Sequence, residues 1–195
     1  MEYYKLYRQC RLCPRACGVD RAEGDGQGKK GFCREGDQLR VSFVGPHFGE
    51  EPPISGKNGS GTIFFSGCSL QCSFCQNYQI SRDCIGKPTT VPRLLERVKK
   101  LCLEKGVHNV NLVTPDHFFT HVIELISRMR EENLNVPILY NVSGYQSVEM
   151  LKVLEPYADI YLPDFKYSDS HLAQRLSKVK DYPEKALVAI VEMVR

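Results

Sequence analysis

The sequence lacks the features that mark membrane and secreted proteins. Among its 195 residues, no apolar run approaches the roughly 20 residues that a membrane-spanning helix needs. The opening stretch, MEYYKLYRQC, has no apolar segment of the kind found in a secretory signal. The formal net charge is only +3, too small to indicate a nucleic-acid or membrane partner. We therefore expect a soluble, cytoplasmic protein.

Several common catalytic motifs are also missing. The segment GDGQGKKG follows no predicted strand and lacks the final Ser or Thr of a phosphate-binding loop. No nucleophile elbow or paired-carboxylate motif occurs. Hydrophobic residues make up 42% and charged residues 25%, which excludes a disordered, collagen-like or coiled-coil chain.

Cysteine, in contrast, is abundant. The nine cysteines form two clusters and two single positions: Cys10, Cys13, Cys17 and Cys33; Cys68, Cys72 and Cys75; Cys84; and Cys102. In a reducing compartment, thiols bind metals or do redox work more often than they form disulfides. The odd, clustered count therefore indicates metal chemistry.

From residue 62 onward, short apolar strands alternate with amphipathic helices. Strands are predicted over 62–65, 110–113, 137–141 and 159–162. Thr90, Asp116 and Ser147 are expected to cap the helices that follow the first three strands, and the last helix begins near Pro183. Four strand–helix units in a row predict an α/β protein with a parallel sheet, either a barrel or a doubly wound sheet.

The remaining segments suggest a division into three parts. Residues 1–40 form a small Cys-rich module, residues 41–61 an irregular linker with at most one short strand, and residues 62–195 the α/β core. The last helix, residues 186–195, has no stop signal. We therefore expect a shortened chain that leaves apolar surface uncovered and is poorly stable alone.

One loop carries the strongest chemical signal. Cys68, Cys72 and Cys75 have the spacing C-x3-C-x2-C directly after the first predicted core strand, where parallel sheets place their sites. A structural zinc normally takes four protein ligands. Three thiolates instead fit three corners of an iron–sulfur cubane and leave one iron open to a ligand that is not protein.

This loop resembles the signature of radical S-adenosylmethionine (radical SAM) enzymes, in which three cysteines hold a 4Fe-4S cluster, with Phe74 in the aromatic position. The longer stretch GTIFFSGCSLQCSFCQNYQIS resembles the branch similar to pyruvate formate-lyase activating enzyme. The resemblance implies a partial TIM-type barrel, here with four of the family's six strand–helix units. It also implies that S-adenosylmethionine (SAM) binds the fourth iron and is cleaved to a 5′-deoxyadenosyl radical that abstracts hydrogen.

The resemblance assigns further cofactor contacts. Asn141 and Ser143, in YNVSGY, match positions that bind the ribose and carboxylate of SAM, and Asp164 and Lys166 match an Asp-x-Lys near that carboxylate. Residues 113–116 depart from the Gly-Gly-Glu stretch that receives the methionine amine in the family. The implied partners are an electron donor such as flavodoxin or ferredoxin and a protein substrate, by analogy a glycyl radical protein.

The N-terminal cysteines suggest a second metal centre. Cys10, Cys13, Cys17 and Cys33 surround a glycine-rich loop and could ligate either zinc or a second iron–sulfur cluster, because their spacing suits both. Cys84, nine residues after Cys75, is a candidate fourth ligand of the first cluster. If it serves as one, the chain is a non-catalytic electron-transfer module. An inactive truncated fragment is a further alternative.

Overall fold

The structure is a computed structural model that describes residues 2–22 and 29–195. Most of the glycine-rich loop predicted near residues 23–31 lies outside the described residues. The strands are β1 (Arg40–His47), β2 (Ser60–Phe65), β3 (Lys87–Pro88), β4 (Val110–Val113), β5 (Ile138–Val142) and β6 (Ile160–Pro163). The helices are η1 (Glu2–Tyr7), α1 (Pro52–Ser55), α2 (Tyr78–Ser81), α3 (Val91–Glu104), η2 (Asp116–Phe118), α4 (Phe119–Glu131), α5 (Val148–Leu154), α6 (Ser170–Ser177) and α7 (Tyr182–Met193).

The strands form one six-stranded sheet in the order β3-β1-β2-β4-β5-β6. The neighbours β2, β4, β5 and β6 run parallel, whereas β1 pairs antiparallel with both β2 and β3. This mixed α/β fold with a mostly parallel sheet fits a partial barrel of the predicted class. Because the four parallel strands are adjacent, the loops at their carboxyl ends meet at one edge of the sheet.

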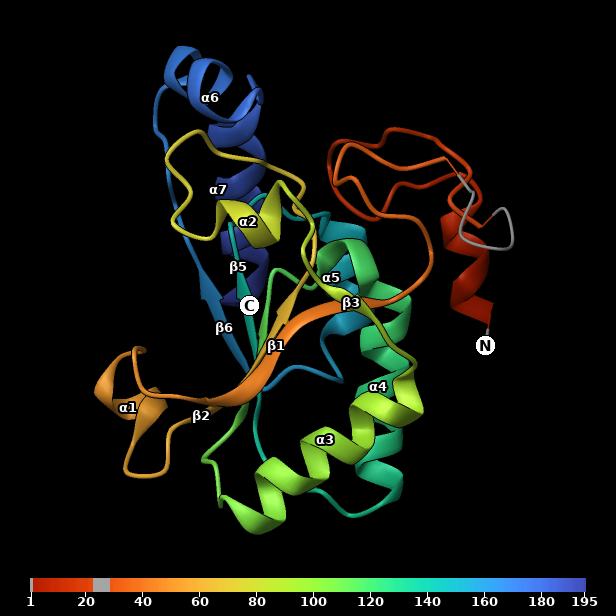
Figure 1. The fold of residues 1–195 in the computed structure, drawn as a ribbon. Coiled ribbons are helices and arrows are strands. Elements are labelled where there is room, and N and C mark those ends of the chain that lie inside the picture. Colours follow the sequence, from red (N-terminus) through yellow and green to blue (C-terminus); the bar gives the residue numbers. More distant parts are fainter. Residues whose placement is uncertain (1, 23–28) are drawn as a thin grey trace.

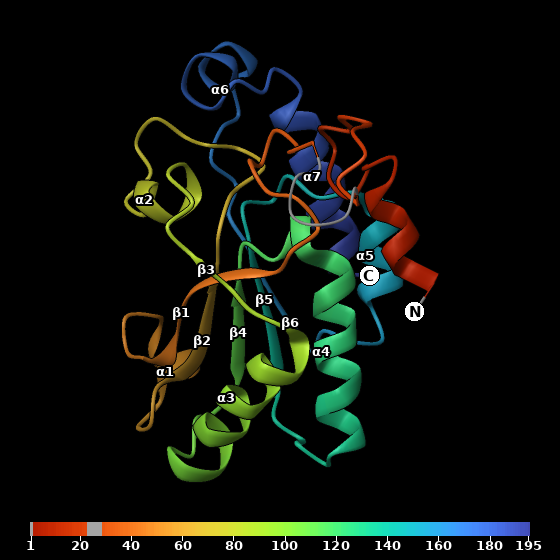
Figure 2. The ribbon, with the colours of Figure 1, turned by 45° about the vertical axis from the view of Figure 1, so that its right-hand side comes forward.

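The two faces of the sheet have different surroundings. On one face, Ile63, Leu112 and Tyr140 occupy one row across β2, β4 and β5 and are almost fully buried in the main core. Helices α3 and α4 supply the other side of that core and lie next to each other in Figures 1 and 2. On the opposite face, Phe64, Val113 and Asn141 form a row. This second face lines a cavity rather than the main core.

Most predicted elements of the core are present. The strand Val110–Val113 has the predicted bounds, and the other three predicted strands differ by one or two residues at their ends. Thr90 Oγ1 accepts a hydrogen bond from the Arg93 backbone N–H, and Ser147 Oγ accepts one from that of Met150, as expected for helix caps. Gly106, just past the end of α3, has a φ of 60°, the left-handed conformation favoured after a helix.

Two expectations need correction. Asp116 does not cap α4: it lies in the short 3-10 helix η2, and α4 begins without a side-chain cap. Residues 41–61 are not mainly an irregular linker, because β1 spans Arg40–His47 and pairs along nearly its whole length with β2. The strand was hard to predict because Gly45 and Pro46 lie within it and both are uncommon in strand interiors.

The N-terminal segment is held against the core by Arg21. This side chain is fully buried, and its guanidinium donates to the carbonyl oxygens of Glu35, Gly36 and His117. It also lies over the Tyr7 ring, 4.7 Å from the centroid. A buried guanidinium needs such partners because an unpaired charge away from water is costly. In Figure 1 the segment lies beside the start of α4.

None of the helices within the described residues has both the length and the apolar character to cross a bilayer.

Candidate functional site

The three-cysteine loop leaves β2 through a sharply constrained glycine. Gly67 has a φ of +83°, and a Cβ at this position would lie 2.5 Å from the Cys33 carbonyl oxygen and 2.6 Å from Glu35 Cγ. Any side chain here would therefore clash with the N-terminal segment. The close approach lets the Cys68 backbone N–H donate to the Cys33 carbonyl at 3.3 Å. The two cysteine clusters are thus neighbours in space.

Each sulfur of the loop accepts one hydrogen bond. Cys68 Sγ accepts from the backbone N–H of Leu70 at 3.4 Å. Cys72 Sγ accepts from Ser177 Oγ at 2.9 Å, and Cys75 Sγ from Ser81 Oγ at 3.3 Å. Donors aimed at sulfur favour the thiolate, which is the form that binds metals.

The loop is fixed from outside by other parts of the chain. Gln71 donates from Nε2 to the Phe32 carbonyl at 2.5 Å, and the Ser73 backbone N–H donates to the Leu176 carbonyl at 2.8 Å. Arg15 donates to the carbonyl of Ser69 in the loop and to those of Ser177 and Lys178 at the end of α6. In Figure 1 the yellow loop accordingly runs beneath α6. The loop is therefore positioned by both ends of the chain.

The loop opens into a cavity of about 560 Å³ on the second face of the sheet. This volume is within the usual range for small-molecule sites. All eight residues predicted for the first cluster and for SAM line it: Cys68, Cys72, Phe74, Cys75, Asn141, Ser143, Asp164 and Lys166. The structure thus brings together side chains from the β2 loop and from the ends of β5 and β6.

The turns after β5 and β6 are tied to each other by Tyr182, a residue that the sequence did not single out. Its hydroxyl lies 2.7 Å from the Ser143 carbonyl and 2.9 Å from the Asp164 carbonyl, and it accepts from the Lys166 backbone N–H at 2.8 Å. Lys166 Nζ pairs with Asp164 Oδ2 at 2.5 Å. Phe74 is 54% exposed, and its ring meets Tyr167 edge-on. No signal in the sequence pointed to the role of Tyr182 in joining the two turns, because a Tyr at helical spacing is most often a core residue.

The surroundings of Cys68 disfavour a free thiolate at this position. Burial raises the pKa of Cys68 to about 12, and the Asp116 carboxylate adds to the shift. Asp116 is itself only 2% exposed, its Oδ2 has no hydrogen-bond partner, and burial raises its pKa to about 6. A thiol in such a position keeps its proton unless a cation replaces it. The donor set therefore fits a metal cluster, whose positive irons would compensate the thiolates.

The N-terminal cysteines lie close to the same region. Cys10 and Cys33 are buried, Cys13 is partly buried and Cys17 is exposed. Cys10 Sγ is 3.5 Å from Arg21 Nη1, and a Cβ on Gly31 would touch the sulfurs of both Cys33 and Cys17. Burial raises the pKa of Cys33 to about 11, although Arg21 opposes the shift.

Neither cysteine group forms a single-ion site. Across residues 2–22 and 29–195, no three His, Cys, Asp or Glu side chains converge on a position for one metal ion. The structure therefore gives no support to the predicted tetrahedral zinc. In a 4Fe-4S cluster each cysteine binds a different iron, so the lack of a single-ion site does not argue against a cluster.

Cys84 is separated from the three-cysteine loop. It follows α2 with a φ of 53°, its thiol donates to the Arg82 carbonyl at 3.8 Å, and it does not line the cavity. The structure therefore does not bring Cys84 to the loop sulfurs as a fourth ligand.

The comparisons with known proteins agree with the geometry of the site. Residues 62–195 match the sequence model of the Radical SAM superfamily. The chain belongs to that superfamily. Membership confirms the resemblance at this level and implies an enzyme of the superfamily with a 4Fe-4S cluster and SAM as cofactors. The narrower branch similar to pyruvate formate-lyase activating enzyme stays a prediction.

A relative among the curated proteins extends the similarity to the N-terminal segment of this radical SAM protein. An uncharacterized protein of Methanocaldococcus jannaschii is 32% identical over 183 residues, which cover 91% of this chain and 51% of the relative. The chain therefore spans about half the length of the curated relative it matches.

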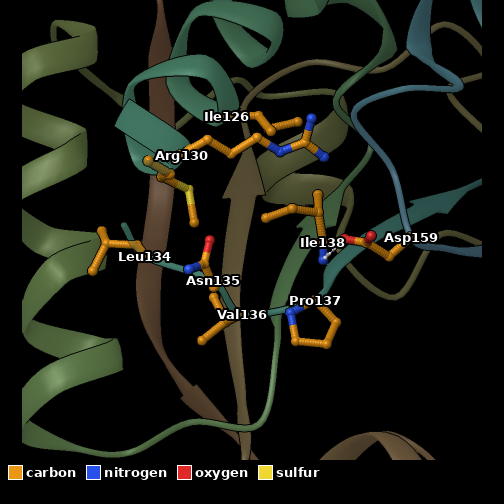
Figure 3. Close-up of a pocket in the computed structure, with 9 residues that line it drawn as sticks. Ile126, Arg130, Leu134, Asn135, Val136, Pro137, Ile138 and Asp159 are labelled. Carbon is orange, nitrogen blue, oxygen red and sulfur yellow. Dashed lines mark hydrogen bonds between the residues drawn. The ribbon is translucent and has the colours of Figure 1, made fainter. Parts of the chain in front are cut away.

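A second cavity, of about 290 Å³, lies near the start of β5 (Figure 3). Its charged side chains are engaged with backbone groups: Arg130 donates to the carbonyls of Pro156 and Tyr157, and Asp159 accepts from the Ile138 backbone N–H. No cysteine lines it. This cavity is distant in the sheet from the carboxyl ends of the strands and offers no chemistry for the radical SAM reaction.

Proposed function

We propose that this chain reductively cleaves SAM and uses the resulting radical to abstract hydrogen from a substrate. The observation that carries the proposal is the convergence of three loop cysteines and four polar residues from β5 and β6 on one cavity. The chemistry that the cluster and SAM supply when bound is one-electron cleavage of the C5′–sulfur bond, which releases methionine and a 5′-deoxyadenosyl radical.

Cys68, Cys72 and Cys75 act as the ligands of the cluster in this proposal. Their hydrogen bonds from Leu70, Ser177 and Ser81 orient the sulfurs and stabilise the thiolates. Three cysteine ligands would leave one iron of such a cluster free to bind SAM.

The polar residues of the cavity hold SAM. Lys166 is a fixed cation, located by its pair with Asp164 and by the backbone bond to Tyr182, and it suits the SAM carboxylate. Asn141 and Ser143 lie at the end of β5, where their amide and hydroxyl groups suit the ribose. Phe74, exposed beside Cys75, supplies an apolar surface next to the cofactor.

Anaerobic reconstitution with iron and sulfide tests the proposal. With SAM and dithionite, the reconstituted chain should release 5′-deoxyadenosine, and Cys72→Ala should abolish the product. Cys102→Ala is the matched control, because this half-buried cysteine lies in α3 outside the cavity. A reconstituted chain that binds iron but gives no 5′-deoxyadenosine would refute the proposed reaction and favour the electron-transfer alternative.

The finer assignments follow from the resemblance to pyruvate formate-lyase activating enzyme. We propose a protein substrate of the glycyl radical kind, a flavodoxin or ferredoxin as electron donor, and a cytoplasmic location. Replacing dithionite by reduced flavodoxin in the same assay tests the donor. A glycyl radical signal in a candidate partner protein that has been mixed with the chain in this assay would support the proposed substrate.

We further propose that Cys10, Cys13, Cys17 and Cys33 hold a second metal centre. Of the two alternatives, zinc and an iron–sulfur cluster, the lack of a single-ion site among the described residues favours the cluster. The support is that the sulfurs of Cys17 and Cys33 both border Gly31, that the sulfur of Cys10 lies against Arg21, and that Cys33 contacts the first loop. The buried Arg21 guanidinium would offset part of the thiolate charge.

A further inference from the structure

One part of the cavity carries a carboxylate from outside the radical SAM match. Glu50 lines the cavity together with His47, Phe64 and Asn141. It belongs to the connection between β1 and α1, upstream of residues 62–195. The wall that it forms therefore lies outside the part of the chain that the family model matches. Binding residues are often found on loops placed by a rigid scaffold.

Glu50 is held in place by two amides from the sheet. Its Oε1 accepts from Asn111 Nδ2 at 3.0 Å and from Asn141 Nδ2 at 3.4 Å. The Glu50 backbone carbonyl accepts from Ser55 Oγ at 3.0 Å. Both amides engage the same oxygen, and no described residue donates to Oε2. One carboxylate oxygen is thus left to accept a hydrogen bond from a ligand.

The negative charge of Glu50 has no cation to balance it. Within the described part of the chain, no Lys, Arg or His lies within ion-pair distance of this carboxylate, and the one lysine of the cavity, Lys166, pairs with Asp164. A ligand that reaches this wall is therefore bound more tightly if it is a cation.

Aromatic rings complete the wall. The rings of His47 and Phe64 meet edge-on with centroids 6.2 Å apart, and both line the same cavity as Glu50. A cavity that holds a carboxylate and aromatic rings favours an organic ammonium, which can gain both an ion pair and a cation–π contact. We propose that Glu50 and Phe64 bind an ammonium group of the substrate. The inference rests on the proposed function, in which the cavity also holds SAM.

The proposal can be tested without the radical reaction. Saturation-transfer-difference NMR on the full chain, with no SAM or reductant, would compare n-butylammonium with its neutral isostere 1-butanol. We expect butylammonium to bind at least about ten-fold more tightly than butanol, and Glu50→Gln to abolish this preference. Gln keeps an acceptor oxygen for Asn111 and Asn141, so the variant should fold, and thermal melting verifies this.

Glu51→Gln is the matched control. It removes the same charge one residue later, at an exposed position outside the cavity, and should leave the preference for butylammonium intact. Equal binding of butylammonium to the wild type and to Glu50→Gln, or equal binding of butanol, would overturn the proposal. Loss of 5′-deoxyadenosine formation with the ammonium preference intact would refute the proposed function instead.

Discussion

The hydroxyl of Ser177 donates a hydrogen bond to the sulfur of Cys72 across 2.9 Å, although 105 residues separate them in the chain. Ser177 Oγ also lies 2.6 Å from the Tyr167 hydroxyl, so a buried chain of polar groups ends on the sulfur. The last residue of α6 is thereby joined directly to the candidate metal site.

This contact should tune the reduction potential of the cluster. A hydrogen bond to a ligand sulfur stabilises the more negative, reduced form. We expect Ser177→Ala to lower the midpoint potential by tens of millivolts, measured by redox titration followed with electron paramagnetic resonance. Ser73→Ala, an exposed serine of the same loop, is the control. An unchanged potential in Ser177→Ala would show that this contact has no electronic effect.

The number of protein ligands can be tested at Cys84. Because its thiol does not line the cavity, Cys84→Ala should keep both the iron content and the spectral shift that SAM causes in the reduced protein. Cys75→Ala should lose both. Electron paramagnetic resonance with and without SAM measures the shift. If Cys84→Ala loses the cluster, Cys84 is its fourth ligand and no iron is open to SAM. The chain would then be the electron-transfer module.

The N-terminal thiols should bind metal independently of the loop. With Cys68, Cys72 and Cys75 all changed to Ala, we expect close to one metal centre per chain to remain, because Cys10, Cys13, Cys17 and Cys33 are untouched. Metal analysis by mass spectrometry distinguishes zinc from iron. Complete loss of metal from the triple variant would contradict a second centre.

Arg15 should contribute to the stability of the whole assembly around the loop. Its guanidinium donates to three carbonyls, those of Ser69, Ser177 and Lys178, and lies 3.6 Å from the centre of the Phe32 ring. We expect Arg15→Ala to lower the free energy of unfolding by about 2 kcal/mol in urea titrations. The exposed Arg11 provides the control, and its change to Ala should have little effect. Equal losses in both variants would mean that the contacts of Arg15 are not stabilising.

A buried histidine should make the chain acid-sensitive. Burial lowers the pKa of His121 to about 4 from 6.5, with Glu124 opposing the shift and Arg21 adding to it. The unfolded chain binds this proton at a higher pH than the folded chain does. The free energy of unfolding is therefore unaffected by this group above pH 6.5 and falls as the pH drops toward 4. The loss is on the order of 3 kcal/mol once complete.

The matched variants for this prediction are His121→Gln and His171→Gln. The first should reduce the fall in the free energy of unfolding between pH 7 and 4, since Gln does not titrate and can still meet the Tyr7 hydroxyl, which lies 2.8 Å from His121 Nδ1. The part of the fall that remains is expected from His117, whose pKa burial lowers to about 3. The second changes an exposed histidine of α6 and should keep the fall. Parallel curves for wild type and His121→Gln would contradict the assignment.

Local patterns predicted the core of the sheet well. The run Val110–Val113 is short, apolar and bounded by turn residues, so its ends could be placed from sequence alone. Ser147 could be identified as a cap because a cap depends only on neighbouring residues. The eight site residues could be predicted to share one region, because the carboxyl ends of parallel strands meet.

What the sequence could not predict depends on contacts between distant segments. Ser177 and Glu50 look like ordinary helix-end and loop residues until the fold brings them to Cys72 and Asn111. Asp116 satisfied the local rule for a cap, but its carboxylate is instead buried between the two cysteine groups. Packing decided these roles, and packing is not visible in residue spacing.

The hydrogen bond from Arg21 to the His117 carbonyl, across 96 residues, also constrains the order in which the chain can assemble. Cys10 and Cys33 are translated before η2, yet the buried positions of their side chains do not exist until the segment around η2 has been made. At about 5–20 residues per second, they wait roughly 5–20 seconds as free thiols. During synthesis these two thiols are therefore open to oxidation, and their burial depends on a part of the chain that is translated later.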